Sequence, residues 1–507
     1  MSNNLITNDR MNRYIYAGHL RGNLKSRSVK GGIVTVTRQA LHFILQIASV
    51  AVLARMLTPK DFGLIAMVST VLGFAHFFKE AGLSIATVQK EDITHDQVST
   101  LFWINAGISI LLSLIIMALS PLVAWFYGEP KLAEITIVMA SMVVLSGLTM
   151  QHQALLRRQM KFGTLAFLAL TAQLIGILSG VYAAFSGLGY WALVVISLVQ
   201  ASTHLLLLWF FCGWRPSMPK RDTNVRELVS FGGNLTVSRL LDYARRQLDD
   251  ILIGVVYGPG PLALYTKAYS LMMLPIRQIN DPLSSIAVPA LSRLQREPEQ
   301  YRRYYCKFVE AIVFFGFPIV GFCTVAAEDI VLVILGEQWI DAIPLFIALI
   351  PAGYAGVLYI SGNAIFVSMG RVKEKLRVEL AGSIIVCVFM IVAVFFGPIY
   401  IAWSFSLSFM VVVILMIKYS FHNSPIGVKD FFASTWRPVA GTFVSSICSL
   451  GLASLSILTL LHPLTQVLVF FPFFLISYIV VIALLPGGSR FLLELTSMVK
   501  ETFTLNR

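Results

Sequence analysis

Residues 31–38 read GGIVTVTR and residues 232–239 read GGNLTVSR, so five of the eight positions are identical. Two further positions exchange similar residues, Val for Leu and Thr for Ser. Each copy opens a long apolar segment and ends with an arginine inside it, Arg38 or Arg239. A charge in hydrocarbon loses its hydration at a large cost. The duplicated arginine therefore favours a role in ligand binding over a role in stability.

The composition indicates a membrane protein with many spans. Of the 507 residues, 57% are hydrophobic and 13% are charged, whereas soluble globular proteins carry about 25% charged residues. The net charge of +13 does not indicate nucleic-acid binding, because the basic residues lie in short loops between apolar runs. The five cysteines show no metal-binding spacing. We expect no metal and no other cofactor.

Hydropathy predicts an all-α polytopic protein, because a spanning helix needs about 20 apolar residues. On that scale the sequence contains about fourteen spanning helices. They are expected at residues 31–57, 62–88, 98–126, 131–152, 161–185, 189–212, 229–257, 262–290, 304–326, 341–369, 376–396, 398–419, 436–461 and 464–486. In addition, residues 328–341 predict a short amphipathic surface helix with Trp339 at the membrane interface.

The basic residues predict the orientation. They cluster in the N-terminal segment and in the loops around residues 157–161, 215–226, 293–307 and 371–377, all on one side of the predicted bundle. Loops rich in Lys and Arg stay in the cytoplasm. Both termini are therefore expected on the cytoplasmic side of the membrane.

The repeat continues beyond the two octamers and predicts the domain organisation. Gln46 matches Gln247 at the same separation, and Thr58-Pro59 matches Gly258-Pro259 one residue closer. Six helices separate the copies, so the two halves run in the same direction as a parallel repeat. The expected parts are a basic cytoplasmic segment (1–30), an N-lobe (31–212), a cytoplasmic inter-lobe loop (213–228), a C-lobe (229–420) and a final helix pair with the cytoplasmic C-terminus (421–507).

Four cations fall inside the helices that the repeat relates. They are Arg38, Lys79, Arg239 and Arg277. Arg38 lies about 10 Å along its helix from the cytoplasmic end, at 1.5 Å per residue. If these helices meet between the lobes, the cations form a cavity that attracts a polyanionic headgroup such as diphosphate.

Other polar residues accompany these cations and are candidates for lining the cavity or coupling an ion. They are His42, Gln46, Glu80, Asp242, Arg246 and Asp249. On the predicted helix 229–257, charged residues recur every three or four positions and so form one stripe, which must face a partner or a wet cavity. The alternative is a self-neutralising ladder that only holds the lobes together.

Four stretches resemble a known family. Residues 53–63 read LARMLTPKDFG, 80–83 read EAGL, 282–294 read PLSSIAVPALSRL and 335–339 read LGEQW. In them the chain resembles the polysaccharide transporters of the multidrug/oligosaccharidyl-lipid/polysaccharide (MOP) exporter superfamily. The resemblance implies a V-shaped fold of two lobes. It also implies a flippase that exports oligosaccharide linked to undecaprenyl diphosphate, for lipopolysaccharide or exopolysaccharide synthesis, with roles for Arg38, Lys79 and Arg239.

Two other functions stay open. A cation-coupled drug or metabolite antiporter of the same superfamily would want an anionic, aromatic cavity. A membrane polysaccharide polymerase or ligase would need a large periplasmic loop, and no loop of that size is predicted. No phosphate-binding loop or hydrolase motif occurs in the sequence, so we expect no enzyme. The expected partners are the lipid-linked oligosaccharide, membrane lipids, a polysaccharide polymerase and a chain-length regulator, with the chain itself a monomer.

Overall fold

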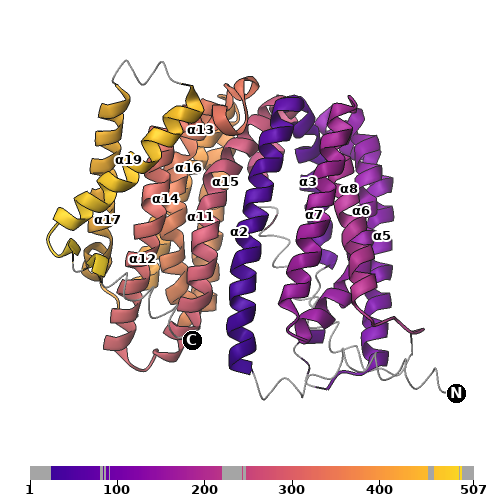
Figure 1. Ribbon diagram of the computed structural model, residues 1–507, viewed down its shortest axis with the longest axis horizontal. Helices are drawn as coiled ribbons and strands as arrows, with labels where there is room; N and C mark the ends of the chain where they lie inside the picture. Colours follow the sequence, from indigo (N-terminus) through magenta and orange to yellow (C-terminus); the bar gives the residue numbers. More distant parts are fainter. Residues whose placement is uncertain are drawn as a thin grey trace. The chain divides into compact units, whose positions relative to one another are not determined.

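The computed structural model describes residues 24–79, 84, 87, 88, 90, 92–219, 243, 247–454, 462–489 and 491–493, with side chains undescribed at 24–33, 36 and 75–79. Every regular element in these residues is a helix (Figure 1), which confirms the all-α prediction. Ten of the described helices are long and apolar enough to cross a membrane. The chain divides into two compact units, Met1–Ala263 and Leu264–Arg507.

The first unit is a helical bundle. Helices adjacent in sequence pack together, α5 on α6 and α7 on α8, and α2 packs on the distant helix α7. Figure 1 draws α5, α6 and α8 side by side, in colours from purple to magenta. The elements are α2 (Leu24–Met56), α3 (Pro59–Lys79), α5 (His95–Tyr127), α6 (Lys131–Arg158), α7 (Phe162–Phe185), α8 (Trp191–Phe211) and α10 (Leu248–Tyr257).

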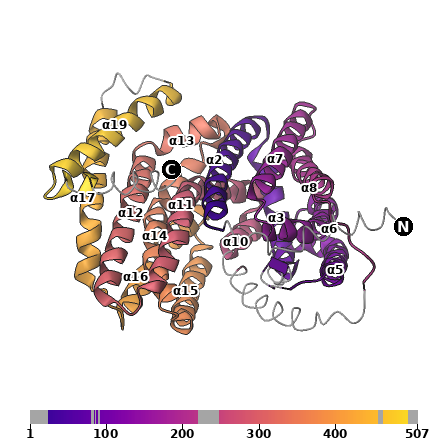
Figure 2. The same ribbon diagram turned by 60° about the horizontal axis from the view of Figure 1, so that its bottom comes forward.

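The chain enters the second unit within α11 (Pro259–Arg293). Figure 2 shows α12 between α14 and α17, and α17 also packs on α19. Arg437 of α17 pairs with Glu310 of α12 at 3.5 Å, which joins the last helix pair to the bundle. The remaining elements are α12 (Pro298–Val325), α13 (Ala327–Ile334), η2 (Glu337–Trp339), α14 (Ala342–Ser368), α15 (Val372–Ala393), α16 (Pro398–Phe421), α17 (Val428–Ala453) and α19 (Pro463–Leu484).

Helix α15 shows how the sequence separates a lipid face from a protein face. Val378, Gly382, Val386 and Met390 recur at every fourth position and are buried. A second fourfold series is exposed, consisting of Val372, Leu376, Leu380, Ile384 and Val388. Residues four apart share a helix face, so the two series form opposite faces. Gly382 admits Val412 of α16, and small residues allow such close approach between membrane helices.

The segment after α12 corrects one expectation. Residues 327–339 form the short helix α13 and the turn η2, but Trp339 is fully buried, so its indole is not exposed to a membrane interface. Gly336 has φ 97°, a conformation that favours glycine, at the turn between the two elements. The indole is packed inside the second unit. An amphipathic pattern predicts the length of such a segment, but it does not predict whether an aromatic residue at its end is buried.

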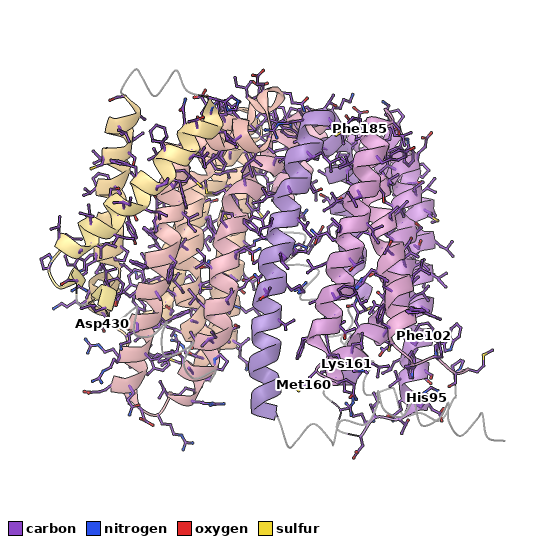
Figure 3. All side chains as sticks on the ribbon, in the orientation of Figure 1. His95, Phe102, Met160, Lys161, Phe185 and Asp430 are labelled. Atoms are coloured by element: carbon purple, nitrogen blue, oxygen red, sulfur yellow. The ribbon has the colours of Figure 1, made fainter. Side chains whose placement is uncertain are left out.

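Two helix ends adopt the same turn. After α6, the Lys161 N–H donates to the Leu156 carbonyl at 2.9 Å, and Met160 has φ 53°. After α14, the Arg371 N–H donates to the Phe366 carbonyl at 2.8 Å, and Gly370 has φ 69°. Both are Schellman turns, in which a left-handed residue usually is glycine. Figure 3 labels Met160 and Lys161 at one end of α7 and Phe185 at the other.

We expect Met160→Gly to raise the melting temperature of the detergent-solubilised protein. A left-handed conformation costs an L-residue about 1–2 kcal/mol, and glycine gives back about half of that gain through its freedom when unfolded. The reverse change at the matched turn, Gly370→Met, should lower the melting temperature. Differential scanning fluorimetry measures both, and a lower melting temperature for Met160→Gly would contradict the expectation.

Candidate functional site

Helix α2 presents a polar face inside an apolar segment. Arg38, His42 and Gln46 follow one another at four-residue spacing, and all three side chains are half-buried. They fall within Thr37–Met56, a segment long and apolar enough to cross a membrane. The Gln173 side chain of α7 donates to the His42 carbonyl oxygen at 3.4 Å. This contact links α2 to α7, and Arg38, one turn before His42, is partly exposed.

The other predicted site residues have different positions. Arg277 is exposed on α11 in the second unit. Asp249 is 6% exposed and lies in the first turn of α10 in the first unit. Lys79 is the last residue of α3, and its side chain lies outside the described part. Also outside the described residues are Glu80, Arg239, Asp242 and Arg246.

Helix α10 is attached to α3 by polar contacts. The Tyr243 hydroxyl donates to the Thr70 carbonyl oxygen at 3.1 Å. One turn later, the Gln247 amide donates to the Thr70 hydroxyl at 3.4 Å. The ring of Phe74 meets that of Tyr243 edge-on, with 4.9 Å between centroids. Thr70 is thus the point on α3 at which both polar side chains of the α10 segment converge.

The same amide reaches the first turn of α10, where two carboxylates stand side by side. Gln247 Nε2 donates to Asp250 Oδ2 at 3.2 Å, next to the buried Asp249. Acidic groups are stabilised at a helix N-terminus, where free N–H groups carry positive charge. Tyr127 of α5 packs against Gly254 of the same helix. Asp249 is buried and Asp250 is partly exposed, so two neighbouring carboxylates are present where the sequence predicts that Asp249 couples an ion.

Sequence reasoning missed most of this junction. Tyr243 and Gln247 carry no charge, and the charged residues that the sequence shows near them form a different stripe. A second indication was available on α3. Gly73 is a small residue in a membrane helix, and small residues mark places where helices approach closely. In the structure, a methyl group on Gly73 would lie 1.7 Å from the Tyr243 hydroxyl oxygen. No pattern in the sequence predicts the contacts of Thr70.

Comparison with known proteins identifies the family. A family model described as "polysaccharide biosynthesis protein" matches residues 52–344. The teichuronic acid biosynthesis protein TuaB of Bacillus subtilis (strain 168) is 24% identical over 413 residues, which cover 81% of this chain and 86% of TuaB. The lipopolysaccharide biosynthesis protein WzxC of Escherichia coli (strain K12) is 23% identical over 429 residues, which cover 82% and 85% of the two chains.

A solved structure identifies the fold. The lipid II flippase MurJ in an inward closed conformation superposes with a TM-score of 0.70 at 13% sequence identity, over 90% of this chain and 98% of MurJ. The family model spans more than half of the chain, and the two relatives each match more than four-fifths of it. The chain therefore belongs to the polysaccharide biosynthesis protein family and has the fold of the MOP transporters, as the resemblance of its sequence implied.

Proposed function

We propose that the chain is a flippase that exports oligosaccharide repeat units, linked to undecaprenyl diphosphate, for polysaccharide synthesis. Family membership supports a role in polysaccharide biosynthesis. The fold is shared with the lipid II flippase MurJ. The observation that carries the proposal is the half-buried Arg38 inside the spanning segment Thr37–Met56. A guanidinium at such a position is costly without an anionic partner, and it binds phosphate oxygens through two parallel hydrogen bonds.

In the proposed mechanism, Arg38, Lys79, Arg239 and Arg277 capture the diphosphate from the cytoplasmic side. The sugars occupy the wet cavity while the prenyl chain stays in lipid. Rocking of the two repeats then exposes the site to the periplasm, as in transporters built from parallel repeats. Reconstitution with a fluorescent lipid-diphosphate oligosaccharide tests this function, because a flippase makes the label in the inner leaflet accessible to a membrane-impermeant quencher outside the vesicle.

A specific observation supports a second candidate, a cation-coupled antiporter of the same superfamily. Asp249 and Asp250 place two carboxylates in the first turn of α10, and intramembrane carboxylates serve as coupling groups in transporters. An antiporter would move a lipophilic cationic dye against an imposed proton or sodium gradient. Dye movement by the reconstituted protein, without movement of the oligosaccharide lipid, would favour this candidate.

We propose the bacterial inner membrane as the location, with both termini in the cytoplasm. The chain would act as a monomer and hand its product to a polysaccharide polymerase and a chain-length regulator. The basic loop between α6 and α7 supports the orientation, because Lys and Arg accumulate in cytoplasmic loops. Lys161 stands at this end of α7, and Phe185 stands at the opposite end (Figure 3).

Cysteine labelling tests this orientation. We expect Lys161→Cys to react with an impermeant maleimide only after the cells are opened, because the residue would face the cytoplasm. Ser186→Cys, just beyond the other end of α7, should react in intact cells, since both positions are exposed. Labelling of Lys161→Cys in intact cells would reverse the orientation, and the second variant controls for accessibility of the reagent.

A further inference from the structure

Some side chains of the second unit are partly exposed on helix faces that are otherwise buried. On α16, Phe409 shares its face with Ala402 and Met416, because residues seven apart lie two turns apart on one side of a helix. Both of these neighbours are fully buried, whereas Phe409 is partly exposed. The outer face of α16 carries the exposed Trp403 and Leu407. The accessible part of Phe409 therefore lies on the side of α16 that is turned away from this outer face.

The same pattern occurs on α14 and α15, the two helices that pack against α16 in the second unit (Figure 2). On α14, Tyr359 is partly exposed, although Ala352 and Phe366, seven residues before and after it, are fully buried. On α15, Glu379 is partly exposed, although Val386, seven residues after it, is buried. Three neighbouring helices thus each have an accessible side chain on a face that their other residues bury.

These three side chains contact one another. The ring centroids of Tyr359 and Phe409 are 5.9 Å apart, and the Tyr359 hydroxyl donates to Glu379 Oε1 at 2.8 Å. Lys375, one turn before Glu379 on α15, pairs with the same carboxylate oxygen at 3.6 Å. The side chains of Lys375 and Glu379 are both partly exposed. The accessible side chains therefore combine an aromatic surface with a carboxylate that already accepts a hydroxyl hydrogen.

Aromatic rings continue from Phe409 to helix α11. The ring of Phe409 stacks on that of Phe405, with 5.6 Å between centroids and 15° between planes. Phe405 meets the ring of Tyr269 on α11 edge-on, with 5.5 Å between centroids. Phe405 and Tyr269 are partly exposed as well. We call this group the aromatic face, and it consists of Tyr269, Tyr359, Glu379, Phe405 and Phe409.

We propose that the aromatic face binds the sugars of the lipid-linked oligosaccharide. This inference rests on the proposed function, in which that lipid is the substrate. A sugar ring presents apolar C–H groups on its two sides and hydroxyl groups at its edge. It therefore suits a site in which aromatic side chains stand beside a few polar groups. The Glu379 carboxylate accepts hydrogen bonds from hydroxyl groups, and such charge-assisted bonds are stronger than those between neutral groups.

The other parts of the proposed substrate fit the aromatic face less well. The diphosphate is anionic, so the like charge of Glu379 repels it. The prenyl chain would cover this carboxylate and remove its hydration at a large cost. A lipophilic cation suits aromatic rings beside an acid, but Lys375 already pairs with the acid. The sugar is therefore the part of the substrate that suits both the rings and the carboxylate.

Binding to the detergent-solubilised full chain tests this assignment with two fluorescent probes, a lipid-diphosphate oligosaccharide and the same lipid diphosphate without sugar. Glu379→Gln should weaken binding of the sugar-bearing probe about tenfold, the effect of one hydrogen bond to a charged group. Phe409→Leu should weaken it about fivefold, the effect of an aromatic contact beyond its buried area. Neither variant should change binding of the sugar-free probe. Fluorescence anisotropy measures both dissociation constants.

Trp403→Leu is the matched control, because it removes an aromatic side chain from the outer face of the same helix α16. It should bind both probes as the wild type does. Equal weakening of both probes by Glu379→Gln and Phe409→Leu would overturn the assignment, and so would unchanged binding of the sugar-bearing probe. A lipophilic cationic dye that competes with this probe, and that Glu379→Gln no longer binds, would assign the aromatic face to cations instead. If Glu379→Gln does not accumulate in the membrane, Phe405→Leu joins Phe409→Leu in the same comparison.

A failure of the proposed function gives a different result. If the wild type neither binds the sugar-bearing probe nor flips it in proteoliposomes, the proposed function fails and the sugar site fails with it. If the wild type binds and flips this probe, but Glu379→Gln and Phe409→Leu show no effect that depends on the sugar, the proposed function stands and the sugar site alone fails.

Discussion

Replacing Arg38 and Arg239 together with alanine is expected to slow oligosaccharide-lipid flipping by about 100-fold or more, and each single change by about tenfold. A hydrogen bond to a charged group contributes about 1.5–3 kcal/mol, and 1.4 kcal/mol corresponds to a factor of ten in rate. Both arginines end a copy of the repeated octamer. In the proposed cavity they reach the same headgroup, so their removal leaves the diphosphate without its two symmetric partners.

The measurement uses proteoliposomes with equal amounts of folded protein, verified by gel filtration and melting temperature. Arg55→Ala is the matched control, because Arg55 lies on the same helix α2 but is exposed near its other end, where it donates to the Ala51 carbonyl. It should flip at the wild-type rate. A double variant with wild-type flipping would refute the cationic cavity. If Arg55→Ala slowed flipping as much as Arg38→Ala does, the effect would reflect the loss of any cation on α2 and not of the repeated arginine in particular.

Much of the fold was predictable because a bilayer imposes simple rules. A spanning helix needs a long apolar run and must satisfy its backbone internally, so hydropathy alone places helices such as α7 and α15 within a few residues. The four-residue spacing of Arg38, His42 and Gln46 in the sequence likewise puts them on one face of α2 once that segment is a helix. These properties are local, and a sequence records them directly.

The contacts that build the site depend on long-range packing, which composition does not record. Thr70 and Gln247 are 177 positions apart, and neither belongs to a pattern that would pair them. Arg158 and Trp339 show the same limit. Each lies near a helix end, where basic and aromatic residues usually meet water or the membrane interface, yet both side chains are buried. Only the three-dimensional arrangement reveals the backbone carbonyls that accept from Arg158.

Gly63→Ala is expected to be among the most damaging small substitutions in the first unit. Gly63 is buried in α3, and a methyl group there would lie 1.7 Å from the Pro259 carbonyl oxygen and 2.3 Å from its carbon. The obstacle is backbone and cannot rotate away as a side chain would. Overpacking costs about 1–3 kcal/mol even where side chains can adjust, so we expect a loss at or above the upper end of that range.

Melting temperature in detergent measures the loss, and two further variants make it specific. Gly107→Ala on α5 meets no heavy atom within 4 Å, and alanine is the better helix former by about 1 kcal/mol, so this variant should melt at or above wild type. Gly73→Ala should be destabilising because of the Tyr243 hydroxyl, and Tyr243→Ala should partly restore it. Equal melting temperatures of Gly63→Ala and Gly107→Ala would refute the close approach.

Because Pro259 begins α11, through which the chain enters the second unit, a forced separation at Gly63 should also slow flipping, whereas Gly107→Ala should leave the flipping rate unchanged.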